Sequence, residues 1–523
     1  MTSDYPLKRD KLVPTLTIGF ITSFILAALL DLDRFKALIQ SLFSASANTF
    51  GPFWQWLLVF NLATALCLAV SRYGKLKLGN RNTPDISTFR WLAMIMCTLL
   101  AGGGVFWSAA EPIQHFITTP PAFDSALNGT QSVNPALSQS FLHWGFLAWA
   151  VLGTLSTIVL MYAHHHGGVK LRPRALLYPL VGNRLENHWI GSVIDACSII
   201  AVAAGTIGPI GFLASQLSYS LQLLGYVDDS MTVQLTILAS VVLIYSLSAF
   251  TGMDKGLQWL SQMNVIGALA LVAAIVVLGP TAFIFSHFGE AFGTYLANFG
   301  EMSLGSSDSS WNAWWTWFFW GWFIGFAPMM GIFIARISQG RSIRELIFAV
   351  AVGAPIATNF WFTVLGGTGI FLELQTPGVI SAPLENAGLP AVLLACLQQL
   401  PLSSVLIPAF LVLTTTFVAT TGDSMAYSIA MAVSGENEPG RKQRLFWALV
   451  MGIVAGVLLL AGDGGLDALQ SFIVITAVPV SMLIAATLIT GPLAVLEMDR
   501  ARQQADRPTG YVKPVPNNIP RLL

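Results

Sequence analysis

The feature that most constrains this chain is a series of long apolar runs without charge, such as residues 265–285, 351–371 and 445–460. A bilayer core of about 30 Å requires roughly 20 apolar helical residues for each crossing. The runs therefore predict an all-α membrane protein with twelve transmembrane helices. They lie near residues 12–30, 52–71, 91–110, 139–163, 189–223, 231–250, 261–285, 313–334, 346–372, 403–432, 445–462 and 467–492.

Two other membrane-related readings do not fit these runs. Strands of an outer-membrane β-barrel alternate in polarity and would not give continuous apolar runs. The first run could resemble the core of a cleavable signal peptide, but Asp31, Asp33 and Arg34 follow it where small residues should mark the cleavage site. We therefore expect residues 12–30 to be a permanent transmembrane helix.

Basic residues gather in every second loop and in the two tails. Of the chain's 26 Lys and Arg residues, only Arg34 and Lys36 lie outside these segments. This asymmetry is the positive-inside pattern. It predicts a multi-pass protein of the bacterial inner membrane, with both termini in the cytoplasm and lipids as its surroundings. The net charge of zero argues against a nucleic-acid partner.

We expect one membrane domain over residues 12–495, with a cytoplasmic N-tail, 1–11, and a short cytoplasmic C-tail, 496–523. Residues 286–305 carry apolar side chains at helical spacing, which predicts an amphipathic helix on the outer surface. A loop that covers the external face is the alternative. The apolar members are Phe288, Phe292, Tyr295, Leu296 and Phe299.

Two predicted spans contain helix-breaking residues. The third has Gly102, Gly103 and Gly104, and the eighth has Gly321, Gly325, Pro328 and Gly331. Backbone groups freed by such breaks are tolerated in a membrane only where they line a cavity within the protein. The two spans are five apart, which predicts inverted repeats over residues 91–285 and 313–492 after two extra N-terminal helices. Secondary transporters with this plan bind their substrate near the midplane.

Aromatic residues surround the glycines of the eighth span, where six of the 16 Trp lie between residues 311 and 322. Interface belts explain the outer ones. The deeper Trp320, Trp322, Phe323 and Phe326 would offer π faces to a cation whose charge is spread over methyl groups. Trp144 and Trp149 of the fourth span would complete such a cage. Core packing or lipid contact is the alternative.

Several motifs resemble the betaine/carnitine/choline transporter family. They are Phe106-Trp107 with Glu111-Pro112, His143-Trp144-Gly145, Gly252 with Lys255-Gly256, the span-eight stretch with its tail at 335–345, and Asp423-Ser424. The resemblance implies twelve helices in the inverted five-helix (LeuT-like) fold, a homotrimer, and transport of betaine-type zwitterions or cations. It implies a substrate site made of Trp144, Trp149, Trp320, Trp322, Phe323, Phe326, Gly102 and Gly103.

The chain departs from the family pattern at this site. Phe323 and Phe326 stand where the family's Trp-Trp-x-x-Trp has tryptophan, and Leu152 stands where a tyrosine is frequent. Phe binds cations more weakly than Trp. A sulfonium zwitterion or a bulkier onium compound is therefore an alternative substrate.

The resemblance also implies a coupling ion, because sodium-driven members use hydroxyl residues in spans five and ten. Thr206, Thr420 and Thr421, with Phe417, match one such cation site, while Val202 replaces a threonine of a second. Threonine bonded to its own helix is the alternative. Asp195 and Asp423 are candidates for proton coupling. We expect no cofactor beyond Na⁺ or H⁺.

Three other functions are compatible with these sequence features. They are sodium-independent substrate exchange, transport of amino acids or nucleobases by the same fold, and a channel. The run His164-His165-His166 lacks the further histidine clusters of a membrane-bound metal enzyme, so we expect no enzyme activity. The C-tail is short and interrupted by prolines, which favours constitutive transport over osmotic activation.

Overall fold

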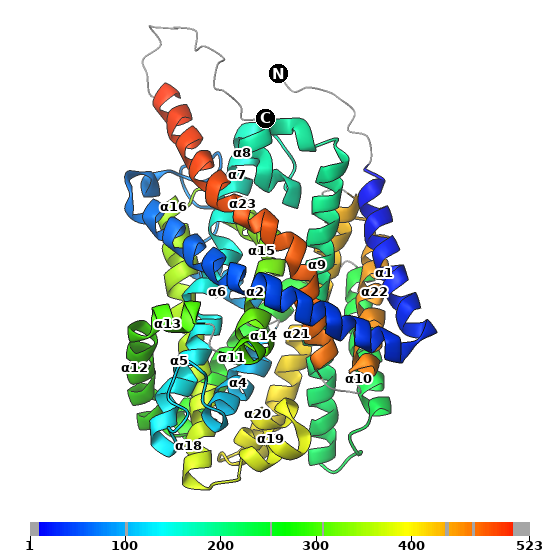
Figure 1. Ribbon diagram of the computed structural model, residues 1–523, viewed down its shortest axis with the longest axis vertical. Coiled ribbons are helices and arrows are strands. Elements are labelled where there is room, and N and C mark those ends of the chain that lie inside the picture. Colours follow the sequence, from blue (N-terminus) through cyan, green and yellow to red (C-terminus); the bar gives the residue numbers. More distant parts are fainter. Residues whose placement is uncertain are drawn as a thin grey trace.

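The computed structural model describes residues 10–99, 103–251, 254–305, 308–434, 439–462 and 466–505. These residues fold into helices, and the extended backbone among them forms one isolated bridge, between Lys77 and Ser342. Most helices run along the long axis, while α2 and α23 cross one face obliquely and pack together (Figure 1). The first half contains α1 Leu12–Leu30, α2 Leu32–Val70, α3 Thr88–Leu99, α4 Val105–Ile117, α5 Val133–Trp144, α6 Phe146–Gly153, α7 Leu155–Gly167, α8 Tyr178–Val181, α9 Trp189–Leu223, α10 Met231–Thr251 and α11 Asp254–Leu278.

The second half repeats long helices with short connecting ones. It contains α12 Thr281–Ala297, α13 Phe299–Leu304, α14 Ser309–Trp314, α15 Thr316–Ile337, α16 Ile343–Phe348, α17 Ala354–Phe362, α18 Thr368–Gln375, α19 Ser381–Ala387, α20 Leu389–Gln398, α21 Ser403–Ser434, α22 Arg441–Ala461 and α23 Asp467–Ala505. Two π-helical segments, Ala349–Gly353 and Thr363–Gly367, link α16, α17 and α18 into one continuous stretch. 3₁₀ turns span Arg72–Lys75, Gly129–Ser132, Pro173–Leu177 and Gly182–Leu185.

The described residues contain ten helical stretches long and apolar enough to cross a membrane, or eleven if the bent pair α11–α12 counts as one more. The chain is thus an all-helical, multi-pass membrane protein in the part that the structure describes. The predicted third span includes residues 100–102, which lie outside the described residues, between α3 and α4. A total of twelve crossings therefore stays a prediction.

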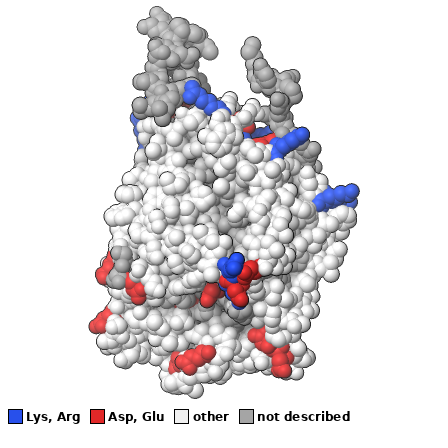
Figure 2. Space-filling model, turned by 45° about the vertical axis from the view of Figure 1, so that its right-hand side comes forward, with Lys and Arg blue, Asp and Glu red and all other residues white. Residues whose placement is uncertain are grey.

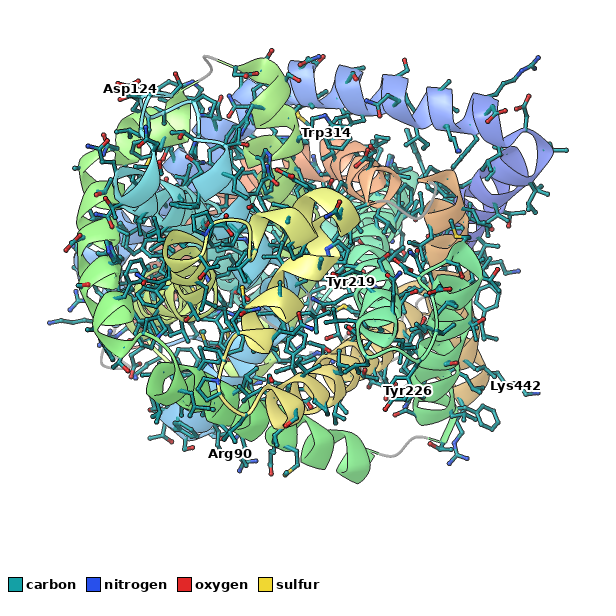
Figure 3. The ribbon with its side chains drawn as sticks, turned by 90° about the horizontal axis from the view of Figure 1, so that it is seen from below. Arg90, Asp124, Tyr219, Tyr226, Trp314 and Lys442 are labelled. Carbon is teal, nitrogen blue, oxygen red and sulfur yellow. The ribbon has the colours of Figure 1, made fainter. Side chains whose placement is uncertain are left out.

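Charged side chains separate between the two ends of the molecule. On the face shown in Figure 2, most Lys and Arg lie near the end at which α1 begins and α23 ends, and most Asp and Glu lie nearer the opposite end. Seen from that opposite end, α19 and α20 lie across the middle (Figure 3), and α20 packs on α4 and α9. This separation is the one that the positive-inside rule requires if both termini are cytoplasmic.

Burial identifies α15 as a central helix and α1 as a peripheral one. Nearly every residue of α15 is buried, including its tryptophans and its glycines. In contrast, the buried residues of α1 are Val13, Thr17, Ile21 and Ala28, which form a single stripe at helical spacing. The aromatic residues of α15 therefore face protein on all sides, and lipid contact does not explain them.

The predicted break in the eighth span is wrong, because α15 is a continuous helix through Gly321, Gly325, Pro328 and Gly331. Its glycines serve close packing instead. An ideal Cβ on Gly321 would lie 2.9 Å from the ring of Trp54, and one on Gly331 would lie 2.9 Å from Ser156. The chain interrupts the helix earlier, at Trp315, between α14 and α15.

The predicted fourth span, in contrast, is divided into α5, α6 and α7 by Gly145 and Thr154. A Cβ on Gly145 would meet the carbonyl oxygen of Phe141 at 2.0 Å and the hydroxyl of Tyr295 at 2.9 Å, so only glycine fits this position. Trp144 is consequently the last residue of α5. This break is an addition to the features predicted from the sequence.

Three helix boundaries also differ from the sequence-based expectation. Helix α2 begins at Leu32, whereas the sequence predicts a loop up to residue 52. The Asp31 side chain accepts a hydrogen bond from the Arg34 N–H at the start of this helix. Helix α23 continues to Ala505, into the expected C-tail; residues 506–523 lie outside the described part. Residues 286–305, for which a surface helix is predicted, belong to α12, which bends by 108° from α11, and to α13.

Candidate functional site

Four aromatic rings from two helices meet inside the fold, and we call Trp144, Phe319, Trp322 and Phe323 the aromatic cluster. The ring of Trp144 on α5 lies 5.4 Å from Phe319, 6.0 Å from Trp322 and 5.4 Å from Phe323, measured between centroids. Trp322 and Phe323 stack with an interplanar angle of 9°. All four are buried. Four aromatic rings are thus packed together in one small region of the core, where a cation–π site would need them.

Helix periodicity and two glycines produce this arrangement. Positions 319, 322, 323 and 326 share one face of α15, because they are three or four residues apart. A Cβ on Gly103 would lie 2.3 Å from the Trp322 ring, and one on Gly205 would lie 2.2 Å from the Phe326 ring. The indole N–H of Trp322 donates to the Gly205 carbonyl oxygen at 3.1 Å. Glycine at both positions lets α9 and the start of α4 close on Trp322.

The structure brings together only part of the predicted substrate site. Trp144, Trp322 and Phe323 belong to the aromatic cluster, with Phe326 and Gly103 beside it. Trp149 instead donates its indole N–H to the Thr358 hydroxyl at 3.1 Å. Trp320 is fully buried, and in the part that the structure describes its Nε1 has no partner and its ring does not pair with the cluster. Gly102 lies outside the described residues.

Phe319 belongs to the cluster but was not among the predicted residues. It lies one turn before Trp322 and Phe323, and its ring also approaches that of His143, at 5.0 Å. The spacing along the eighth span could have found it, because residues three and four positions apart share a helix face.

One small cavity lies beside the site, and a larger one lies at the helix ends. A hollow of about 20 Å³, room for roughly one water molecule, is lined by Gly103, Phe106, Gln216, Thr414 and Phe417. A larger cavity of about 340 Å³ opens between the ends of α7, α15 and α21, where Lys170, Arg172 and Arg336 line it. The rings of the aromatic cluster pack against one another, so a substrate would have to separate them.

The predicted cation ligands are all hydrogen bonded to their own helices. The Thr206 hydroxyl donates to the Val202 carbonyl at 2.8 Å, on α9. Those of Thr420 and Thr421 donate to the Phe417 carbonyl on α21, at 2.8 and 2.9 Å. Thr420 also accepts from the Asn264 amide at 3.2 Å. Each hydroxyl keeps an oxygen lone pair for a hard cation, which prefers oxygen ligands.

The two intramembrane aspartates that the sequence analysis singled out have polar partners. Asp195 on α9 accepts from the backbone N–H of Arg174 at 2.8 Å and from its Nε at 2.7 Å. Asp423 on α21 accepts from the Ser248 hydroxyl on α10 at 2.6 Å. Each contact joins two neighbouring segments, so both aspartates have a structural role.

A third buried carboxylate lies much closer to the aromatic cluster. Glu111 on α4 accepts from the indole N–H of Trp144 at 2.8 Å, and its other oxygen is 2.5 Å from His143 Nδ1. In the sequence, Glu111 and His143 were noted only as parts of motifs shared with the family, without a role of their own. The available signal was an intramembrane carboxylate, which is a functional candidate wherever it occurs. Its pairing with α5 depends on tertiary contacts that sequence spacing does not show.

Comparison with known proteins identifies the family. A family model described as "BCCT, betaine/carnitine/choline family transporter" matches residues 12–500. Glycine betaine transporter 2 of Vibrio parahaemolyticus is 50% identical over 475 residues, which cover 91% of this chain and 88% of that protein. The ectoine/hydroxyectoine transporter of Virgibacillus pantothenticus is 30% identical over 86% of this chain and 90% of that one. Among solved structures, a substrate-bound, outward-open Na⁺-coupled sialic acid symporter matches with a TM-score of 0.46 and 13% identity, over 88% of this chain and 99% of that chain.

The family assignment rests on the match along almost the whole chain and on the 50% identical relative. The family model covers the motifs around Trp144 and Trp322 from which the aromatic cluster is built. The protein is therefore a membrane transporter and not an enzyme, and it belongs to the betaine/carnitine/choline transporter family.

Proposed function

We propose that this chain imports a small quaternary-ammonium or betaine-like solute, glycine betaine first among the candidates, by alternating access. The aromatic cluster is the observation that carries the proposal. A cation whose charge is spread over methyl groups gains about 0.5–2 kcal/mol from each ring face, and more in a dry site. The names of the relatives, transporters of glycine betaine and of ectoine, point to the same class of compatible solutes.

Phe323 and Phe326 bind a cation more weakly than tryptophan would, so this site is compatible with other substrates. A sulfonium zwitterion or a larger onium compound would suit a site with fewer indoles. An amino acid or a nucleobase would need a pocket specific for a carboxylate or a ring, and the aromatic cluster favours neither. Sodium-independent exchange of substrate for product is the alternative to coupled import.

The finer architecture belongs to the same proposal. It comprises twelve crossings, inverted repeats over residues 91–285 and 313–492, cytoplasmic termini, a bacterial inner membrane, and a homotrimer. Gly102 and Gly103 would then let the third span approach the substrate. The close contact between Gly103 and the Trp322 ring supports this role. The charge separation between the two ends supports the orientation.

The test is intrinsic fluorescence of the purified protein, titrated with glycine betaine, choline, carnitine and dimethylsulfoniopropionate. We expect a saturable change with at least one of them, because the ligand must separate two buried indoles, Trp144 and Trp322. Proline and uracil serve as ligands of the competing classes. Saturable binding of either, without binding of any onium compound, would refute the proposed substrate class.

Sodium coupling predicts that Thr421→Val removes any effect of sodium on substrate affinity. Valine keeps the shape of threonine and removes the hydroxyl that donates to the Phe417 carbonyl. Thr415→Val is the matched control, because Thr415 makes the same kind of bond, to the Leu411 carbonyl at 2.7 Å. Affinities are measured in sodium and in choline-free potassium buffers. Loss of the sodium effect in both variants, or in neither, would contradict this assignment.

A further inference from the structure

Buried polar groups without an assigned role meet around Glu111, and we call Glu111, His115 and His143 the Glu–His cluster. Glu111 and His115 lie one turn apart on α4, and His143 on α5 immediately precedes Trp144. Their side chains are 0%, 1% and 0% exposed, respectively. The interior does not tolerate such groups without compensation, so their protons and partners must be accounted for.

A proton lies between Glu111 and His143. Their atoms Oε1 and Nδ1 are 2.5 Å apart, and two bare acceptors do not approach so closely. The same distance leaves no room for a metal ion between these two atoms. Ligand atoms about 2 Å from a common ion lie roughly 3 Å or more from each other. The contact is therefore a hydrogen bond with one proton.

A second proton can be accommodated on the other side of His143. Nε2 of His143 lies 2.9 Å from the Thr316 hydroxyl and 3.0 Å from the Gln139 amide. A hydroxyl donates or accepts, and an amide offers N–H or, turned over, C=O. Both neighbours thus suit Nε2 with or without a proton. The Glu111–His143 pair can carry a net charge of −1 with one proton, or zero with two.

His115 offers a further position for that proton. Its Nε2 lies 3.4 Å from Glu111 Oε1. Neither of its ring nitrogens has a hydrogen-bond partner among the described residues, and its ring packs on Trp315 with 4.7 Å between centroids. Its Nε2 is therefore the nearest further nitrogen to which a proton of the carboxyl could move.

Charged groups on the elements around α4 and α5 are engaged elsewhere. On α12, His287 and Glu290 bond to Asn134, and on α18 Glu373 accepts from backbone N–H groups at Gly378, Ile380 and Ser381. The other titratable groups on the surrounding described elements are Tyr295, Glu301, Arg336 and Cys396. The charge of the Glu–His cluster is therefore set mainly by its own protons.

Trp144 connects the Glu–His cluster to the aromatic cluster. Glu111 Oε2 accepts from the Trp144 indole N–H, whose ring faces Trp322 and Phe323. Negative charge behind the indole attracts a cation in front of it, and attraction is strong in an interior of low dielectric constant. A proton added to the Glu–His cluster cancels that charge.

We propose that the Glu–His cluster is a proton-binding site linked in the opposite sense to cation binding at the aromatic cluster. A substrate cation binds more tightly when the cluster holds one proton fewer, and its binding releases one proton from an imidazole nitrogen to the solvent. Linkage makes the two effects reciprocal. This inference rests on the proposed function, because it takes the aromatic cluster as the cation site.

The test is calorimetric titration of the purified full chain with choline and glycine betaine, from about pH 5.5 to about pH 8.5, where histidine titrates. We expect the Kd of choline to fall by up to about tenfold as the pH rises, the effect of a shift of one pKa unit. The effect on glycine betaine should be smaller, because its carboxylate offsets its cation. Titrations in two buffers of different ionisation enthalpy should show proton release. Choline itself has no proton to lose.

Two variants assign the effect to the cluster. Glu111→Gln keeps an acceptor for Trp144 and removes the charge, so the Kd should no longer depend on pH and should stay near the weak, acidic value of the wild type. If this variant does not fold, His143→Gln should move the midpoint of the pH profile by at least about one unit. His287→Gln, a histidine outside the cluster, should retain the wild-type profile.

The outcomes separate the inference from the function on which it rests. Binding without pH dependence or proton release would overturn the inference and leave the proposed function standing. An unchanged profile in both cluster variants would also overturn it, as would an affinity that a chelator abolishes, which would indicate a metal site. If no onium compound binds at any pH, both proposals fail.

Discussion

Replacing Trp322 by leucine is expected to weaken glycine betaine binding by at least about tenfold, and to lower uptake at subsaturating substrate in proportion. Trp322 is one of the two indoles of the aromatic cluster, and indoles offer the strongest π face to a cation. It stacks on Phe323 and meets Trp144, Phe318 and Phe212 with centroid distances of 6.0, 5.6 and 6.3 Å.

The loss has two causes that a second variant separates. Leucine removes the π face that attracts a cation, and it leaves the Gly205 carbonyl without the indole donor. Trp322→Phe restores a weaker π face without the N–H. It should recover part of the affinity for glycine betaine. If instead Trp322→Phe is as weak as Trp322→Leu, the hydrogen bond to Gly205 positions the site more than the ring face does.

Trp56→Leu is the matched control for a lost tryptophan. Its side chain is 52% exposed on α2 and stacks on Phe60, so its removal should leave the Kd unchanged. Folded protein is quantified by size-exclusion chromatography before binding is measured. A folded Trp322→Leu protein that binds glycine betaine within about twofold of the wild type would show that the cation site is elsewhere.

The length of apolar runs predicted the long helices well. Helix α9 spans Trp189–Leu223 and α1 spans Leu12–Leu30, the ranges expected from the sequence. A run of apolar residues without charge allows few conformations in a membrane, because each backbone group must bond within its own helix. The early start of α2 could also have been predicted from the sequence. Its buried residues Phe35, Ile39, Phe43 and Ala47 follow one another at four-residue spacing after Asp31.

Glycine was the ambiguous signal. In α15 it permits close packing, as at Gly321 against Trp54, whereas at Gly145 it ends a helix. Both uses need a position without a side chain, and the sequence does not show which neighbour approaches. The break was therefore predicted in the eighth span and missed in the fourth.

Sequence reasoning about the candidate site was limited to single helices. Trp322, Phe323 and Phe326 were chosen because they surround the glycines of one span, whereas the partners of Trp144 and Trp149 depend on other helices. Trp144 bonds to Glu111, 33 residues away, and Trp149 to Thr358, 209 residues away. Local periodicity carries no information about such pairs, which follow from tertiary packing.

Replacing Asp195 by alanine is expected to lower the folding stability by about 3–5 kcal/mol, the usual result of removing one partner of a buried ion pair. The Arg174 side chain that it would leave behind is 1% exposed. Its Nη2 is 2.6 Å from Asp10 Oδ2, and its Nη1 donates to the Glu186 carbonyl at 2.9 Å. One guanidinium thus joins the start of α1, the 173–187 connection and α9.

The measurement is thermal unfolding of the purified variants in one detergent. Asp195→Asn, which keeps an acceptor for the Arg174 backbone N–H, should be less destabilised than Asp195→Ala. Glu497→Ala is the control, because Glu497 pairs with Arg500 near the surface, where the two side chains are 41% and 59% exposed and such pairs contribute little. A melting temperature of Asp195→Ala equal to that of the control would refute the buried-pair argument.

These contacts also separate a structural role of Asp195 from proton coupling. Arg174 donates to both of its oxygens, so the carboxylate already holds two neighbouring segments together. Burial works against the charge of Asp10, yet hydrogen bonds from Arg174 and Ser192 outweigh it and lower the pKa of that carboxyl. Because this pKa is lowered, the contribution of Asp10 to the folding stability is complete at neutral pH. That contribution disappears only as the pH falls through the pKa of Asp10. Because the Asp195 carboxylate serves this junction, we expect Asp195→Asn to lose stability, while each folded molecule retains the wild-type pH dependence of uptake.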